Sequence, residues 1–181
     1  MDDMPKRKPN RMAGYNYSQN GAYFITICAK NRAEIFSRIV PVGATAPGRP
    51  RVPVPTVQLT PLGQCVDDTI QMQNKNGVTI DRYVIMPDHI HAVVFIAVET
   101  GECDGRKNGD AGDRGRSPLQ GVVRNVKSFV TKLAGFSPWQ KSFYDHIIRN
   151  EIEYVQIIKY IEDNPAKWIA GETEETIQWL Q

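Results

Sequence analysis

The distribution of apolar residues along the chain predicts four β-strands. Stretches rich in aromatic and β-branched residues are typical of strands with at least one buried face. These stretches are residues 23–28, 78–86, 89–98 and 139–147. Pro87 and Asp88 separate the second stretch from the third, so these two form either an antiparallel pair or one long bent strand.

Three further segments repeat apolar residues at intervals of three and four, which predicts helices. Their ranges are 61–75, 119–133 and 150–164. The first begins at Thr60 and Pro61, a pair that suits a helix start, and the second is followed by Gly135, a common C-terminal cap. Pro165 should end the third helix, because a residue before proline is pushed out of the helical region.

Two segments have the composition of loops. Residues 40–61 contain six prolines, which cannot propagate a helix and would interrupt a central strand. We expect an extended loop there, with room for an edge strand near Val57. Residues 100–118 are rich in Gly, Asp, Arg and Asn and have almost nothing to bury. The order of elements predicts an α+β domain with an antiparallel sheet and helices mainly on one face.

The length and composition predict one globular domain. A chain of 181 residues can form one core and is too short for two ordinary domains, so we expect a single domain over residues 1–181. No apolar run approaches the roughly 20 residues that cross a bilayer, and the N-terminus resembles no signal peptide. We therefore expect a cytoplasmic protein with no membrane partner. Three widely spaced cysteines favour reduced thiols over a disulfide framework.

The charge is weakly positive and unevenly distributed. A net charge of +2 does not by itself indicate a nucleic-acid partner. Four cations crowd the N-terminus, where they form either an arm that follows DNA phosphates or a solvated tip. They are Lys6, Arg7, Lys8 and Arg11. Arg124 and Lys127, on the polar side of the second predicted helix, are further candidates for DNA contacts, although a charged stripe is usually a solvated face.

The clearest candidate for metal chemistry is a pair of histidines. His89 and His91 lie two residues apart in a predicted strand, so their imidazoles point to the same side and can share one ion. Ile90 should point the other way, into the core. Two strand histidines are more often surface or hydrogen-bonding groups, so the pair alone does not establish a metal site. We interpret His146 as a structural hydrogen-bonding group and not as a ligand.

Tyr160 is the candidate nucleophile. On a helical wheel its neighbours within about 40° are polar, and the opposite arc is apolar. The polar neighbours are Glu153, Gln156 and Asn164, and the apolar arc holds Tyr154, Val155, Ile158 and Ile161. Asn164 follows Tyr160 by one turn, so a phenol and a carboxamide could approach one ion or phosphate together. The alternative is a tyrosine at the boundary of the core, with its ring buried and its hydroxyl wet.

Six separated parts of the sequence together resemble the REP-associated tyrosine transposases, members of the HUH superfamily of single-strand DNA transposases with one catalytic tyrosine. The parts are 14–18 leading to 23–26, 84–91, 127–129, 139–143, 145–149 and 160–165. They span nearly the whole chain outside two loops. These loops, at about 41–56 and 100–117, look like insertions relative to the compact family pattern.

The resemblance implies a ferredoxin-like or RNA-recognition-motif-like fold with the histidine strand at its centre. It implies that His89 and His91 are the HUH pair, Tyr160 the nucleophile and Asn164 the third metal ligand. The implied activity cuts single-stranded or hairpin DNA with Mg²⁺ or Mn²⁺ through a 5′-phosphotyrosine, which another 3′-OH can attack to join strands. Some relatives are dimers that exchange the tyrosine helix and others act as monomers, so a homodimer and a monomer are both compatible.

Two other functions are compatible with the same residues. A metal-dependent hydrolase could use the histidines to activate water, in which case the phenol of Tyr160 would be dispensable. A domesticated, non-catalytic binder of structured DNA or RNA could retain the motif residues and bind a hairpin without cutting it.

Overall fold

The computed structural model describes residues 15, 19–43, 53–75, 77–97 and 117–171. Its main sheet has the strand order β4-β5-β1-β6, and every neighbouring pair is antiparallel. In chain order the elements are β1 (Gly21–Cys28), the short 3-10 helix η1 (Lys30–Arg32), β2 (Ser37–Gly43), β3 (Pro53–Leu59), α1 (Pro61–Gln71), β4 (Val78–Ile85), β5 (His89–Ile96), α2 (Pro118–Ala134), β6 (Tyr144–Ile148) and α3 (Glu151–Ala170).

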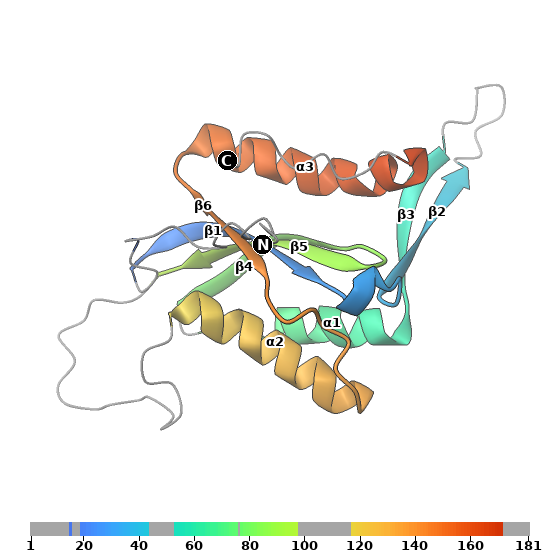
Figure 1. The fold of residues 1–181 in the computed structure, drawn as a ribbon. Helices are drawn as coiled ribbons and strands as arrows, with labels where there is room; N and C mark the ends of the chain where they lie inside the picture. The colour runs from blue at the N-terminus through green and yellow to red at the C-terminus, as the bar shows by residue number, and fades with distance from the viewer. Residues whose placement is uncertain (1–14, 16–18, 44–52, 76, 98–116, 172–181) are drawn as a thin grey trace, which may run out of the picture.

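The main sheet consists of two β-α-β units, β1-α1-β4 and β5-α2-β6, which is the ferredoxin-like arrangement. Helices α1 and α2 cover one face of the sheet and α3 covers the other (Figure 1). The prediction of an α+β fold with helices mainly on one face is therefore confirmed. Strands β4 and β5 form an antiparallel pair and not one bent strand, and β5 lies at the centre of the sheet.

Alternation along the strands separates two apolar cores. Tyr23, Ile25 and Ile90 point toward α1 and α2 and belong to the larger core. Phe24 and Val93 point toward α3 and form the smaller core with residues of that helix. The predicted inward orientation of Ile90 is confirmed, since only 1% of its surface is exposed. The two histidines beside it consequently point toward α3.

The proline-rich segment forms a β-hairpin, which corrects the prediction of an extended loop. Strands β2 and β3 pair with each other in a separate two-stranded sheet, and Pro41 lies opposite Pro55. Prolines are tolerated because each strand has one unpaired edge that needs no N–H donor. The edge strand expected near Val57 is present, but its partner was missed. Both strands contact α3.

The first two helices have the predicted caps. The Thr60 side chain accepts a hydrogen bond from the Gly63 N–H, and Gly135 ends α2 in a left-handed conformation with φ 74°. Gly63 packs closely against the preceding segment, because a Cβ placed there would lie 1.9 Å from the Phe36 carbonyl oxygen. Only a glycine allows α1 to approach the chain so closely at this point.

The prediction that Pro165 ends the third helix is wrong, since α3 continues through it to Ala170. A proline inside a helix removes one backbone hydrogen bond, which tertiary packing can offset. Pro165 is buried, and the extra turn brings Trp168 against the His89 ring, with centroids 6.3 Å apart. The part of α3 that follows Pro165 thus packs against the main sheet.

Several predictions lie partly or wholly outside the described residues. The expected insertion at 100–117 falls there except for Ser117, and the one at 41–56 falls there between residues 44 and 52. The strand predicted at 139–147 is shorter in the structure, where it is β6 (Tyr144–Ile148). Before this strand, Trp139 makes an isolated bridge to Ala29. Within the described ranges no helix is long and apolar enough to span a membrane.

Candidate active site

Two imidazoles occupy the centre of the sheet face that α3 covers. His89 and His91 lie on β5 with 0% and 3% of their surfaces exposed. Their ring centroids are 4.5 Å apart at an interplanar angle of 65°. The alternation of the strand places them side by side, as the sequence predicted. They are buried groups, however, and not half-exposed ones.

A hydrogen bond between Nδ1 and a neighbouring side chain orients each ring. The His89 Nδ1 lies 2.5 Å from the Asp88 carboxylate, and the His91 Nδ1 lies 2.9 Å from the Thr26 hydroxyl. With Nδ1–H as the donor in both bonds, the Nε2 atoms are the nitrogens that can coordinate a cation. Such outer partners fix the tautomer and the orientation of metal-binding histidines. Sequence reasoning assigned no role to Asp88 or Thr26.

Tyr160 reaches this pair from α3. Its hydroxyl oxygen lies 3.4 Å from the His91 Nε2, and the ring centroids are 5.2 Å apart. Phe24 packs its ring edge-on against Tyr160 at 6.0 Å and stacks on His91 at 5.2 Å. Phe24 therefore contacts both the phenol ring of Tyr160 and the imidazole of His91, and it helps to fix their relative positions. The Lys167 ammonium lies 5.5 Å from the Tyr160 ring centroid, where it makes a cation–π contact.

The helical-wheel prediction for α3 was wrong in one respect. Tyr160 and Ile161 share the side of the helix that faces the sheet, although they were assigned to opposite arcs. Val155, expected on the apolar arc, is 57% exposed. The wheel ranked residues by polarity, whereas the buried side of α3 includes polar groups because the sheet opposite it presents histidines.

Asn164 lies on the same side of α3, one turn from Tyr160. It is 5% exposed. Tyr160 contacts His91, and Trp168, one turn beyond Asn164, packs near His89. The carboxamide therefore lies between two helix positions that both face the histidine strand. Only the continuation of α3 past Pro165 creates the Trp168 contact, so the sequence prediction could not include it.

The donor set is compatible with a divalent cation. Two imidazole nitrogens and an amide oxygen are ligands that ions such as Mn²⁺ accept, and water or phosphate oxygens can complete the shell. Within the described ranges, no cluster of three or more His, Cys, Asp or Glu residues could hold a metal. A metal at His89 and His91 would therefore depend on the Asn164 amide and the substrate.

His146 has the structural role that the sequence predicted. Its Nε2 lies 2.6 Å from a Glu153 carboxylate oxygen, which joins β6 to the first turn of α3. Burial alone would raise the pKa of Glu153. The Arg149 backbone N–H and the His146 ring outweigh this effect and lower the pKa below its ordinary value. The pair fixes the start of the helix that carries Tyr160.

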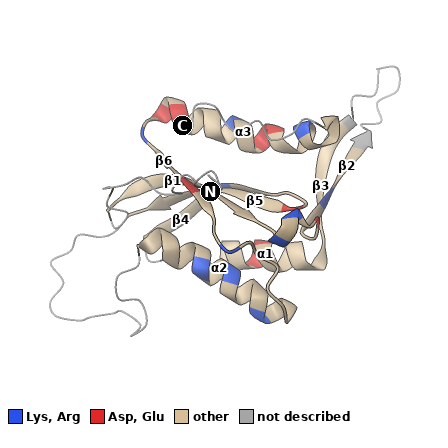
Figure 2. Ribbon diagram, viewed as in Figure 1, with Lys and Arg blue, Asp and Glu red and all other residues tan. Residues whose placement is uncertain are grey.

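The candidate DNA contacts on α2 differ from each other. Figure 2 shows several Lys and Arg residues along this helix. Arg124 is exposed. The Lys127 ammonium instead donates to the carbonyls of Gln140 and Ser142, each at 2.8 Å, and burial lowers its pKa. Lys127 thus supports the segment before β6. The four N-terminal cations Lys6, Arg7, Lys8 and Arg11 lie outside the described residues.

Comparisons with known proteins give relatives in sequence and in fold. No model of a known protein family matches the chain. An uncharacterized protein from Haemophilus influenzae (strain ATCC 51907 / DSM 11121 / KW20 / Rd) is 35% identical over 175 residues, covering 90% of this chain and 89% of that protein. A REP-associated tyrosine transposase from Escherichia coli (strain K12) is 22% identical over 156 residues, covering 84% of this chain and 72% of that protein.

A solved structure shares the fold. It is that of a REP-associated tyrosine transposase bound to a REP hairpin. The TM-score is 0.57 at 20% sequence identity, and the match covers 90% of this chain and 77% of the other. At this identity the likeness establishes the fold alone.

Proposed function

This chain belongs to one family with the uncharacterized Haemophilus influenzae protein, and we propose that it is a transposase-like DNA endonuclease and strand transferase. The proposal assigns Tyr160 as the nucleophile. The observation that carries it is the 3.4 Å separation between the Tyr160 hydroxyl and the His91 Nε2. A phenol and two neighbouring imidazoles have been brought together from segments 69 residues apart.

A divalent cation, Mg²⁺ or Mn²⁺, would be held by His89, His91 and Asn164. When bound, it would supply Lewis-acid stabilisation of negative charge on the phosphate. Asp88 and Thr26 keep the Nε2 atoms of the two rings directed toward this position through their contacts at Nδ1. These contacts and the burial of both rings support a preorganised site.

Tyr160 would attack the scissile phosphorus. A phenol has an ordinary pKa of about 10 and is a weak nucleophile near neutral pH, so its position must provide much of the advantage. As the Tyr160 oxygen bonds to phosphorus, the phenol proton is released, the bond to the 3′ oxygen breaks, and that oxygen takes up a proton. The products are a 5′-phosphotyrosine and a free 3′-OH, and the reverse attack by another 3′-OH would join strands.

Single-stranded or hairpin DNA is the proposed substrate. The fold is shared with a transposase whose structure contains a REP hairpin, which supports a hairpin as the first probe. Tyr160 reaches the histidines of its own chain, so the proposed site is complete in a monomer. A homodimer that exchanges α3 is not required by this geometry.

The direct test is incubation of the protein with single-stranded hairpin oligonucleotides and Mg²⁺ or Mn²⁺. Denaturing gels and mass spectrometry would detect DNA linked to Tyr160. The variant Tyr160→Phe should lose the adduct and at least about a thousandfold in cleavage rate, as expected for loss of a nucleophile. Tyr154→Phe is the matched control, because Tyr154 lies on the same helix and its hydroxyl contacts Asp81 at 2.6 Å.

Two other results would replace the proposal. Cleavage that survives in Tyr160→Phe without an adduct would indicate a hydrolase that activates water. Tight binding of hairpins without cutting under any metal condition would indicate a non-catalytic nucleic-acid binder.

A further inference from the structure

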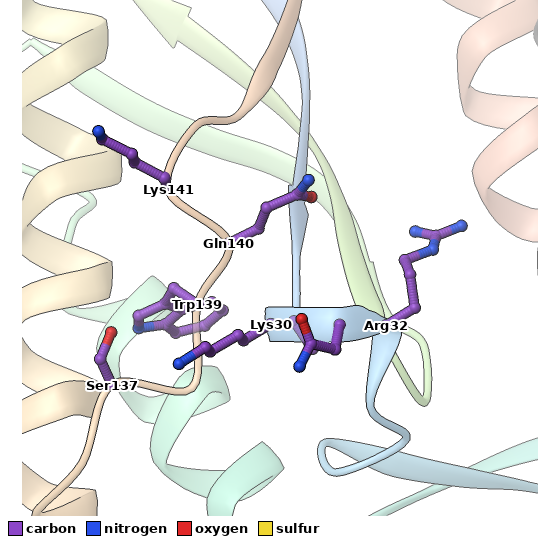
Figure 3. Close-up of a pocket in the computed structure, with 8 residues that line it drawn as sticks. Lys30, Arg32, Ser137, Trp139, Gln140 and Lys141 are labelled. Atoms are coloured by element: carbon purple, nitrogen blue, oxygen red, sulfur yellow. The ribbon is translucent and has the colours of Figure 1, made fainter.

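A pocket lies at the end of β1, next to the residues that follow this strand. It has a volume of about 510 Å³, and two segments line it: residues 29–32, which follow β1, and residues 137 and 139–141, which precede β6. Three of its lining residues are cations, Lys30, Arg32 and Lys141, and within the described part of the chain none of the lining residues is acidic. Figure 3 shows Lys30 and Arg32 extending in opposite directions from η1.

Backbone hydrogen bonds hold the two walls of this pocket together. The Gln140 N–H donates to the Cys28 carbonyl at 2.9 Å, and the Lys30 N–H donates to the Pro138 carbonyl at 2.7 Å. Trp139 forms the floor, where it is 6% exposed and stacks on Phe36 with ring centroids 5.0 Å apart. The pocket is therefore a fixed feature of the fold and not a gap between independent loops.

The wall formed by η1 has a strained backbone. Asn31 and Arg32 have φ angles of 57° and 53°, in the left-handed region that residues other than glycine rarely adopt. Such conformations persist where the surrounding structure over-determines them, and they cluster at ligand-binding positions. Here the turn sends the Arg32 guanidinium to Asp88, with Nε 3.0 Å from a carboxylate oxygen.

Arg32 links this pocket to the candidate active site. The Asp88 carboxylate that pairs with Arg32 also contacts the His89 Nδ1. The Ala29 N–H donates to the Asp88 carbonyl at 2.8 Å, so the first residue of the pocket wall is fixed to the residue before the histidine. The first residue of the pocket wall and the first histidine of β5 are thus both held by Asp88.

We propose that this pocket binds backbone phosphates of single-stranded DNA adjacent to the scissile phosphate. The exposed ammonium groups of Lys30 and Lys141 meet the phosphates, and the Gln140 side chain offers hydrogen bonds to sugar or base. Arg32 aligns the pocket with the catalytic centre through Asp88. This inference rests on the proposed function, because it assigns a subsite to the same substrate.

The test measures binding without cleavage. The full chain carrying Tyr160→Phe is titrated in EDTA against a fluorescein-labelled 12-nucleotide oligothymidine strand, with fluorescence anisotropy as the readout. Lys30→Ala and Lys141→Ala should each weaken binding about fivefold at 0.1 M salt. Each phosphate contact to a single strand changes log K by about 0.7 for each tenfold change in salt concentration. Between about 1 M and 0.1 M salt, one contact therefore contributes a factor of about five in affinity. The double variant should lose about 25-fold, and each single variant should reduce the salt slope by about 0.7.

Lys75→Ala is the matched control. Lys75 is an exposed lysine beside Val78, whose partner Ile96 lies at the opposite end of β5 from His89. Its removal should leave the affinity unchanged. Equal affinities for all three lysine variants, or no binding by the parent protein, would overturn the pocket assignment. Adduct formation at Tyr160 is measured separately with metal and hairpin DNA, so a failed pocket and a failed nuclease assignment give different results.

Discussion

Thr26→Val tests whether a hydroxyl group on β1 prepares His91 for metal binding. Valine has nearly the same shape as threonine and keeps the β-branch that suits a strand, but it cannot hydrogen bond. The substitution removes the 2.9 Å contact between the Thr26 hydroxyl and the His91 Nδ1. His91 is 3% exposed, so its Nδ1 would lose this hydrogen bond in a buried position.

The size of the effect follows from that burial. Leaving a buried polar group unsatisfied costs about 1–3 kcal/mol, so the free energy of unfolding should fall by this amount at neutral pH. Loss of the outer partner of a histidine ligand typically lowers metal affinity by about 10- to 100-fold. We therefore expect a clear reduction of Mn²⁺ affinity in a folded protein.

Isothermal titration calorimetry with Mn²⁺ measures the affinity, and urea denaturation measures the stability. Thr69→Val is the matched control, because Thr69 is also buried, with 2% of its surface exposed, but its hydroxyl donates to the Cys65 carbonyl within α1. The control should leave Mn²⁺ affinity unchanged. Unchanged affinity in Thr26→Val would refute the role of the hydroxyl, and absence of Mn²⁺ binding by the wild-type chain would refute the metal site itself.

Two further predictions concern stability. Gly63→Ala should lower the free energy of unfolding by about 1–3 kcal/mol, measured by urea denaturation, because the added Cβ would lie 1.9 Å from the Phe36 carbonyl oxygen and force the backbone apart. Unchanged stability would contradict the close approach. The pKa of Glu153 is lowered in the folded state, because a backbone N–H and His146 outweigh the opposing effect of burial. The stabilising contribution of Glu153 is therefore present above its unfolded pKa and is lost as the pH falls through its folded pKa. Glu153→Gln should therefore destabilise the protein at pH 7, and the difference from wild type should shrink below about pH 4. Glu162, an exposed glutamate of the same helix, provides the control. A difference independent of pH, or one matched by Glu162→Gln, would contradict this assignment.

The sequence by itself determined the elements whose signals are local. Stretches rich in aromatic and β-branched residues identified strands of the main sheet, and the alternation of side chains along a strand required His89 and His91 to share a face opposite Ile90. The caps at Thr60 and Gly135 were equally visible, because a cap depends on residues within one turn of the helix end. These features need no knowledge of what packs against them.

Other features depended on contacts between distant segments. A proline normally ends a helix, yet α3 continues through Pro165. Prolines normally interrupt strands, yet β2 and β3 form a hairpin whose free edges need no donors. In both cases tertiary packing outweighed a local preference. Overriding such a preference costs a few kcal/mol, which long-range contacts can offset.

Only the tertiary structure decided how the candidate site is assembled. The sequence placed Tyr160 and Asn164 on a polar side of their helix, but it could not show that this side faces the sheet. It also could not show that Asp88 and Thr26 hold the two imidazoles. Periodicity specifies which side chains share a face of one element. Which faces meet depends on the burial of side chains over the whole fold. In this fold the Tyr160 hydroxyl lies 3.4 Å from the His91 Nε2, although the two residues are 69 positions apart in the sequence.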